Sequence, residues 1–288
     1  MSRLQVLLAS LCFGTTGTAQ ALGPAGLSPA GVGAARIVVG GALLVLVALC
    51  SSGLRGLPRV PLILGALAVA SYQLAFFAAV ADTGVAVGTI IALGSGPAFA
   101  GAIEWALERR TPTRAWATAT ALACAGVVML ALSGTEAAIS VLGVTLALIA
   151  GASYAGYTYA SKRMLVDGHS PEAVMAGAFG LGAVFLLPVL LVTGVSWLGT
   201  GDGFLLALFL GIVPTAGAYL LFARGLKRLS AAETATLTLA EPLTATLLGV
   251  IVLSETLSIP AGVGAALILS GLIVLAAPEV RRPVTVTA

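Results

Sequence analysis

Tyrosine and hydroxyl side chains recur at helical spacing within an apolar stretch at residues 141–161. Tyr154, Tyr157 and Thr158 share one broad face there, and Ser153 joins Tyr157 at the i, i+4 spacing that brings helix side chains together. A phenol that faced lipid at mid-depth would lose its hydrogen-bond partner. Two interpretations therefore stay open: these hydroxyls bond to a neighbouring helix, or they line a cavity that binds a small solute.

Three other apolar stretches carry groups that would suit the same cavity. Gln73 is the strongest candidate among these residues because its amide has hydrogen-bond donors and acceptors that need partners. Phe76 is assigned to packing. Thr15 and Thr16 either face the cavity or bond back to a carbonyl of their own helix. Apolar and aromatic walls with a few polar groups are typical of small-molecule sites. The candidate cavity residues are Thr15, Thr16, Tyr72, Gln73, Phe77, Tyr154, Tyr157, Tyr219 and Phe222.

Two ionisable residues, Arg36 and Glu241, lie far inside apolar stretches. A charge inside the bilayer costs about 3 kcal/mol unless it is paired or hydrated, so a functional role is the first interpretation. Arg36 either contacts a substrate carboxylate, or forms a structural ion pair or extends its charged end toward the membrane surface (snorkelling). Glu241 either takes up a proton or contacts an ammonium group for transport, or it forms a hydrogen bond with the backbone that Pro242 leaves unpaired. Pro97 and Pro242 each remove a helix hydrogen bond, which indicates a kink or a gating hinge. Glu104, near the end of its stretch, is expected to be solvated.

The residue types needed for bond-breaking chemistry are sparse. Cys12, Cys50 and Cys124 lie in or beside apolar stretches, and the one histidine, His169, is in an expected loop, so neither a disulfide framework nor a metal cluster is predicted. The patterns GxSxG, HExxH and GxxxxGK[ST] do not occur in the sequence. We therefore expect no enzyme activity, no metal, no cofactor and no ATP-driven pump.

Composition places these groups in a membrane protein. Hydrophobic residues make up 59% of the 288 residues and charged residues 9%, against roughly a quarter charged in soluble domains; the mean hydropathy is +1.10. The scattered basic residues do not form a nucleic-acid footprint. Uninterrupted apolar runs exclude the alternating pattern of a membrane β-barrel. An all-α protein is predicted, with ten helices at about 4–20, 28–50, 60–80, 85–107, 114–132, 141–161, 172–192, 203–223, 231–253 and 260–277.

The charge pattern orients these spans. With the N-terminus in the cytoplasm, every lysine and arginine except Arg36 falls on the inside, and the opposite loops carry Asp82, Glu136, Asp202 and Glu255. This asymmetry follows the positive-inside rule, so both termini are expected in the cytoplasm of a bacterial-type inner membrane. The run at 19–21 resembles a signal-peptide cleavage site, but an internal repeat that includes the first span argues against cleavage.

The repeat emerges from matched residues at nearly constant offsets. An offset of 142 carries Ser28, Pro29 and Gly40 onto Ser170, Pro171 and Gly182, and pairs Thr15 with Tyr157, which makes Tyr157 the strongest single candidate. An offset of 145 relates Phe77 to Phe222, Pro97 to Pro242 and Gly126 to Gly271. Because five spans per copy is odd, the second copy must be inverted, an architecture typical of carriers. The expected division is 1–134, 138–277 and a cytoplasmic tail at 278–288.

Four segments carry a resemblance to a known family. Residues 239–257 and 264–274, with looser counterparts at 94–110 and 123–130, resemble the drug/metabolite transporter superfamily in its ten-helix form with two EamA-type halves. Within it the chain is most similar to YddG-type exporters of aromatic and other amino acids. The resemblance implies a pore lined by spans one, three, four, six, eight and nine, with spans five and ten outside. One departure is Gly96, which stands where the second half has Glu241.

These observations together predict a secondary transporter. We expect it to export small amphipathic metabolites, amino acids including aromatic ones, by alternating access, with the lipid bilayer as its surroundings and protons as a possible coupling ion. A nucleotide-sugar, sugar-phosphate or drug carrier of the same superfamily is the alternative, although phosphate would need several buried cations. An intramembrane enzyme is the remote alternative.

Overall fold

The computed structural model describes residues 1–288 except Ser52, Arg55, Arg110, 133–139, Glu255, Leu257 and 277–288. The described part contains helices and connecting turns and no strand, which confirms the all-α prediction. The elements are α1 (Ser2–Leu22), α2 (Pro29–Cys50), α3 (Arg59–Glu108), α4 (Arg114–Leu132), α5 (Val141–Val166), α6 (Pro171–Val192), the 3-10 helix η1 (Ser196–Gly199), α7 (Gly201–Gly211), the π-helix η2 (Ile212–Gly217), α8 (Ala218–Leu226), α9 (Ala231–Leu237), α10 (Ala240–Leu253) and α11 (Ile259–Ala276).

The helices have the length and composition of membrane spans. Seven described segments are long and apolar enough to cross a bilayer, and two shorter apolar helices, Arg114–Leu130 and Ile259–Leu275, accompany them. Helix α1 has 21 residues but is not among these segments; hydroxyls such as Thr15 and Thr18 make its second half more polar. The protein is thus a multi-pass membrane protein. Glu136, Glu255, the expected junction at 134–138 and the tail at 278–288 lie outside the described residues.

Four expected spans differ in detail from the structure. The stretches 60–80 and 85–107 form one element, α3, which turns at Gly84 with φ +81° instead of through a loop; only glycine adopts this conformation readily. The eighth span passes through the π-helix η2. The ninth divides into α9 and α10, so Pro242 lies in the first turn of α10 and not in mid-helix. A proline there costs no helix hydrogen bond.

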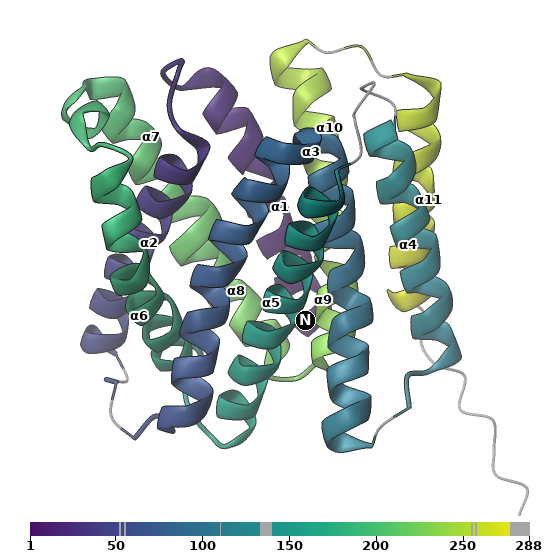
Figure 1. The fold of residues 1–288 in the computed structure, drawn as a ribbon. Coiled ribbons are helices and arrows are strands. Elements are labelled where there is room, and N and C mark those ends of the chain that lie inside the picture. The colour runs from purple at the N-terminus through teal and green to yellow at the C-terminus, as the bar shows by residue number, and fades with distance from the viewer. Residues whose placement is uncertain are drawn as a thin grey trace, which may run out of the picture.

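The two halves run in opposite directions through the bundle. Arg3, at the start of α1, pairs with Glu233 of α9, and Lys162, near the end of α5, donates to the carbonyl of Leu226 just before α9. The first helix of one half therefore begins at the end of the bundle where the first helix of the other half finishes, as Figure 1 shows. This is the arrangement that an inverted repeat of five spans requires.

Matched positions of the repeat make matched contacts. Ser28 and Ser170 both cap the helix that follows, accepting from Gly31 N and Ala173 N, because serine accepts well at this position. Gly40 of α2 packs on Thr215 of the α7–η2–α8 span, and its counterpart Gly182 of α6 packs on Val69 of α3. Each half thus packs the second helix of its repeat against a helix of the other half.

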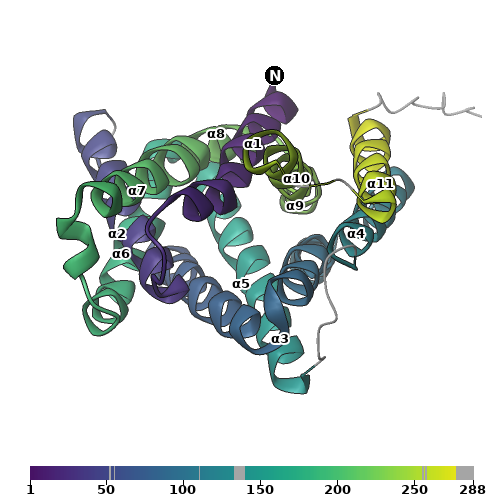
Figure 2. The ribbon, with the colours of Figure 1, turned by 90° about the horizontal axis from the view of Figure 1, so that it is seen from above.

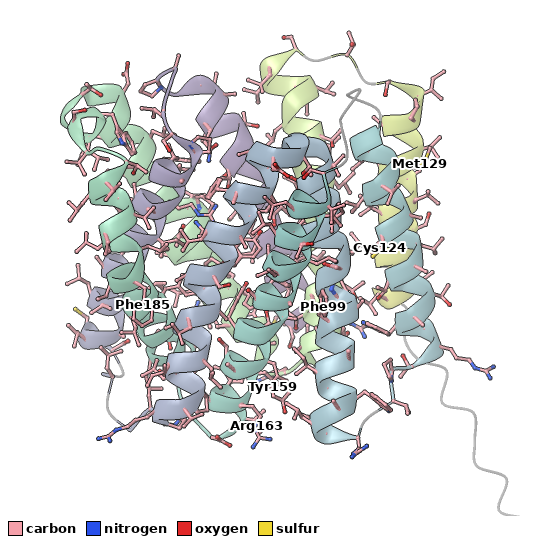
Figure 3. All side chains as sticks on the ribbon, viewed as in Figure 1. Phe99, Cys124, Met129, Tyr159, Arg163 and Phe185 are labelled. Atoms are coloured by element: carbon pink, nitrogen blue, oxygen red, sulfur yellow. The ribbon has the colours of Figure 1, made fainter. Side chains whose placement is uncertain are left out.

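Helices α4 and α11 stand apart from the remaining bundle. They lie side by side at one edge when the molecule is viewed from above (Figure 2). Gly126 of α4 approaches the backbone of Gly264 so closely that a Cβ would overlap Ile268 as well, and Gly271 of α11 approaches Ala119 and Ala123 in return. Small residues permit this backbone contact. Cys124, labelled on α4 in Figure 3, joins this helix to α3. Its Sγ lies 3.1 Å from the Gly94 carbonyl oxygen.

Candidate functional site

Five aromatic rings from four helices form a buried aromatic cluster in the centre of the bundle. Its members are Phe13 of α1, Tyr157 of α5, Phe179 of α6, and Tyr219 and Phe222 of α8. The Tyr219 ring centroid lies 4.0 Å from that of Phe179, 4.9 Å from that of Phe13 and 6.0 Å from that of Tyr157. Edge-on and tilted contacts of this kind stabilise aromatic packing. The aromatic cluster therefore joins both halves.

Burial of the aromatic cluster changes the role expected for Tyr157. Its side chain is only 2% exposed, and its hydroxyl has no hydrogen-bond partner of good geometry among the described residues. Tyr219 and Phe222 are also buried. In this conformation these three candidates pack against one another and do not line open space. The Tyr219 side chain is the polar neighbour of the Tyr157 hydroxyl, within the aromatic cluster.

Gln73 and Phe77 belong to the packing of α3 against α2. The Gln73 amide donates from Nε2 to the carbonyl oxygen of Gly33 at 2.9 Å, and Gln73 is buried. The Phe77 ring lies against Gly33, where any Cβ would overlap it. The donors of Gln73 that made it a cavity candidate are thus engaged in a contact between helices.

A second aromatic group keeps part of its surface accessible. Tyr72 stacks on Phe76 with ring centroids 5.6 Å apart, and lies 6.3 Å from Tyr154. All three side chains are partly exposed. The Tyr154 hydroxyl is 2.7 Å from the Thr238 hydroxyl, at the break between α9 and α10. The Tyr154 ring also packs on Gly96, which explains the glycine that replaces an acid in the first half.

Arg36 and Glu241 bring opposite charges near this accessible group. Glu241, in the first turn of α10, interacts electrostatically with Arg36 of α2, and both act on Tyr72 and Tyr219. Both side chains are partly accessible although they lie deep in the molecule. The Arg36 Nε atom is buried and has no hydrogen-bond partner among the described residues. We define the accessible group, Arg36, Tyr72, Phe76, Tyr154 and Glu241, as the charged aromatic site.

The hydroxyls of Thr15, Thr16 and Thr158 bond within their own helices. They donate to the carbonyls of Cys12, Phe13 and Tyr154, at 2.6, 2.7 and 2.8 Å. Thr15 also lies on the face of α1 opposite Phe13 and so does not meet Tyr157. It lines a space of about 450 Å³ between α1, α7 and α10, which we term the lateral groove, with Thr18, Leu22, Asp202, Phe209 and Leu248 among its other lining residues.

The end of the bundle that holds Arg3 is closed by contacts between the halves. The Arg3 Nε donates to Glu233 at 2.7 Å, and Glu104 of α3 accepts from the backbone N–H of Ala231. Both contacts hold the first turn of α9, and the Thr120 and Thr236 hydroxyls, 2.9 Å apart, add a further contact between halves. Glu104 was expected to be solvated; this was wrong, because it satisfies a free N–H at the start of a helix.

Several residues of this region were not singled out in the sequence. Phe13 and Phe179 lacked a polar atom to draw attention, and Phe179 lies on a span that the resemblance did not assign to the pore. Thr238 gave no signal because the division between α9 and α10 was not predicted. The Arg3–Glu233 pair joins residues far apart in the chain, and an isolated charge near a helix end indicates only a solvated surface.

Comparisons with known proteins identify the same two repeats. The EamA-like transporter family matches residues 2–132 and again 141–277. The uncharacterized transporter YwfM of Bacillus subtilis (strain 168) is 44% identical over 97% of this chain and 95% of its own length. The uncharacterized inner membrane transporter YicL of Salmonella typhimurium is 25% identical over 76% of this chain and 72% of its own. A solved crystal structure superposes with a TM-score of 0.83 at 22% identity, over 95% of both chains, which shows the same fold.

Proposed function

Because the chain belongs to the EamA-like transporter family, we propose that it is a secondary transporter that exports small amphipathic amino acids, aromatic ones included, across the bacterial plasma membrane. The observation that carries the substrate class is the charged aromatic site, in which Arg36 and Glu241 present opposite charges to the same aromatic surface. A zwitterion that leaves water must replace hydration at both of its charged ends. The cation of α2 and the anion of α10 provide those partners.

Each member of the charged aromatic site has a distinct part in this proposal. Arg36 receives the substrate carboxylate through its partly accessible guanidinium group, since guanidinium binds carboxylate with paired N–H donors. Glu241 receives the ammonium group. The rings of Tyr72, Phe76 and Tyr154 hold the apolar side chain, as walls of small-molecule sites usually do. Uncharged or singly charged analogues should therefore bind more weakly than the amino acid.

Alternating access follows from the arrangement of the halves. The contacts of Arg3 and Glu104 with the first turn of α9 close one end of the interface. Release of those contacts, with closure at the opposite end, would expose the charged aromatic site to the other side. Glu241 is the group that we propose takes up a proton in place of the ammonium, which would couple export to a proton gradient.

A sugar-phosphate carrier is less compatible with the charges. A phosphate group is usually bound by several cations. Among the described residues, the charged aromatic site contains one cation, Arg36. The nearby Glu241 would repel phosphate. The same acid would favour a cationic drug, but Arg36 would then be left without a partner.

The experiment is counterflow in proteoliposomes with a panel of labelled solutes. Tryptophan, phenylalanine, leucine, glutamate, glucose-6-phosphate and a cationic dye are compared in vesicles preloaded with unlabelled solute. We expect tryptophan, phenylalanine and leucine to exchange, and the other three to stay near the level of empty vesicles. Exchange of glucose-6-phosphate or the dye with no amino-acid flux would contradict the proposal. The exposed Arg59→Ala variant serves as a control for protein quality.

A further inference from the structure

The lateral groove shares no lining residue with the charged aromatic site. It runs between the last turns of α1 and the first turns of α7, with Leu248 of α10 on its other side. From Asp202 to Phe209 the groove follows α7 for about 10 Å, at 1.5 Å per residue. Its volume of about 450 Å³ is within the range of about 300–1,000 Å³ that holds small ligands.

The face of α1 that lines the groove is the face turned away from the protein. Leu4, Leu8 and Leu11 are exposed by 58%, 40% and 48%. The same stripe continues at helical spacing through Thr15, Thr18 and Leu22, which line the groove. The opposite face, which includes Val6, Phe13 and Gly14, is buried. The lateral groove therefore continues the exposed apolar stripe of α1, at the boundary where α1 of the first half meets α7 and α10 of the second.

The lining suits an aliphatic chain. Leu22, Leu205 and Phe209 present apolar surface that no other described part of the protein covers completely. The Thr15 hydroxyl is already bonded to the Cys12 carbonyl, so its methyl group can contact a chain without leaving a polar atom unsatisfied. Hydrocarbon is also the solvent on this side of a membrane helix.

A single carboxylate stands where the groove meets the end of the helices. Asp202 is exposed, lies in the first turn of α7 and lines the groove. No ion pair with Asp202 is formed among the described residues. A primary ammonium group donates hydrogen bonds to a carboxylate, whereas a quaternary ammonium has no N–H and an anionic headgroup is repelled.

From this combination we propose that the lateral groove binds a phospholipid with a primary amine headgroup, phosphatidylethanolamine, with one acyl chain against α1 and α7 and its ammonium at Asp202. The site is distinct from the transported solute's site and does not depend on the proposed substrate. Its occupant lies between α1 of the first half and α7 and α10 of the second. A bound lipid therefore stabilises the arrangement of the halves that the structure shows.

The test is lipid titration of the purified protein in detergent, with phosphatidylethanolamine, phosphatidylcholine and phosphatidylglycerol that carry identical oleoyl chains. The thermal unfolding midpoint and the number of lipids retained in native mass spectrometry are measured. We expect a saturable rise in the midpoint, with half-saturation by phosphatidylethanolamine at about two- to fivefold lower concentration than phosphatidylcholine, the size of a partly exposed charge contact. Phosphatidylglycerol should be the weakest.

Three variants locate the effect. Asp202→Asn should retain lipid binding but lose the preference for phosphatidylethanolamine, whereas Asp167→Asn, at an exposed acid near the end of α5, should behave as wild type. Thr18→Phe and, from the opposite wall, Leu205→Trp should remove the saturable shift for all three lipids. The proposal is overturned if wild type shows no lipid preference, if Asp202→Asn keeps it, or if both filled variants still bind lipid. It is equally overturned if tryptophan raises the thermal unfolding midpoint of the wild type and Thr18→Phe removes that rise, because the groove would then bind the transported solute.

Discussion

At the scale of single residues, accessibility separates the candidates that their chemistry had grouped together. Tyr157, Tyr219 and Phe222 are packed in the aromatic cluster, while Tyr72 and Tyr154 keep accessible surface beside Arg36 and Glu241. The sequence was enough to single out Arg36 and Glu241, because a charged side chain deep in a membrane span is costly unless it is paired or hydrated. Which tyrosines accompany them depends on contacts between distant spans, and sequence spacing does not contain that information.

Replacement of Arg36 tests the carboxylate contact. We expect Arg36→Ala to weaken tryptophan binding about 10- to 100-fold, the value of a hydrogen bond to a charged group. Binding of tryptamine, which has no carboxylate, should change much less. Equilibrium binding of both labelled ligands to detergent-purified protein measures the two effects. An equal loss of affinity for tryptophan and tryptamine would mean that Arg36 supports the fold and does not bind the carboxylate.

Two changes at Tyr157 separate packing from polarity. Tyr157→Ala should lower the free energy of unfolding by about 3–5 kcal/mol, because it leaves a large cavity in the aromatic cluster. Tyr157→Phe removes a hydroxyl that forms no hydrogen bond of good geometry among the described residues, so stability should be unchanged or higher. Denaturant or thermal unfolding in detergent measures both. A strongly destabilised Tyr157→Phe would show that the hydroxyl has a bonding role in the folded protein.

At the scale of elements, the sequence predicted the repeat better than it predicted the breaks within helices. Ser28 and Ser170 were matched in sequence, and both cap helices as serines before proline should. The corner at Gly84 was not distinguishable from a short loop, because one glycine is enough for it. The division of α9 from α10 occurs at Thr238 and Leu239, ahead of Pro242, and no residue there is a strong helix breaker.

Helix α9 is held by the Arg3–Glu233 pair, and a charge exchange tests that contact. In a background without native cysteines, alkylation of Ser10→Cys, which lies near Leu237 of α9, reports access from the Arg3 end. Arg3→Glu should raise the alkylation rate by up to about fivefold, since a partly exposed ion pair contributes at most about 1 kcal/mol. The double variant Arg3→Glu with Glu233→Arg should restore the slow rate. If it stays fast, the pair does not hold the closed end.

The pairing of α4 with α11 depends on the absence of a side chain at Gly126. Gly126→Ala should force the helices apart and lower stability by about 1–3 kcal/mol, as overpacked cores do. Gly17→Ala is the matched control, because a Cβ there meets no atom within 4 Å. Thermal unfolding in detergent compares the two. A larger loss at Gly17 than at Gly126 would contradict the close packing described for α4 and α11.

At the scale of the whole molecule, the two inverted halves are similar in helix arrangement and different in chemistry. The repeated glycines and caps build the same scaffold twice, yet the acid of the charged aromatic site comes from Glu241 alone, since Gly96 accommodates the Tyr154 ring. The arginine likewise comes from α2 of the first half. Repetition was visible in the sequence because it is carried by local packing positions. The asymmetry of the site became clear only when the halves were placed together.

The orientation expected from the charges is tested by two cysteines in the same cysteine-free background. Arg59→Cys, at the start of α3, should react with an impermeant thiol reagent only from the cytoplasmic side, and Asp202→Cys only from outside, since basic residues stay in the cytoplasm. Intact cells and inverted vesicles provide the two sides. The reverse pattern would overturn the assigned orientation, and labelling of both positions from one side would overturn the number of crossings between them.

The most direct test of the transport account is tryptophan uptake into proteoliposomes with and without a proton gradient, for wild type, Glu241→Gln and the control Asp82→Asn. We predict that wild type and Asp82→Asn accumulate tryptophan against its gradient when protons flow in the opposite direction. Glu241→Gln should still exchange tryptophan but lose the accumulation, because an amide cannot take up the proton. Tryptophan accumulation by Glu241→Gln equal to that of wild type, or no tryptophan flux by the wild type, would contradict the account.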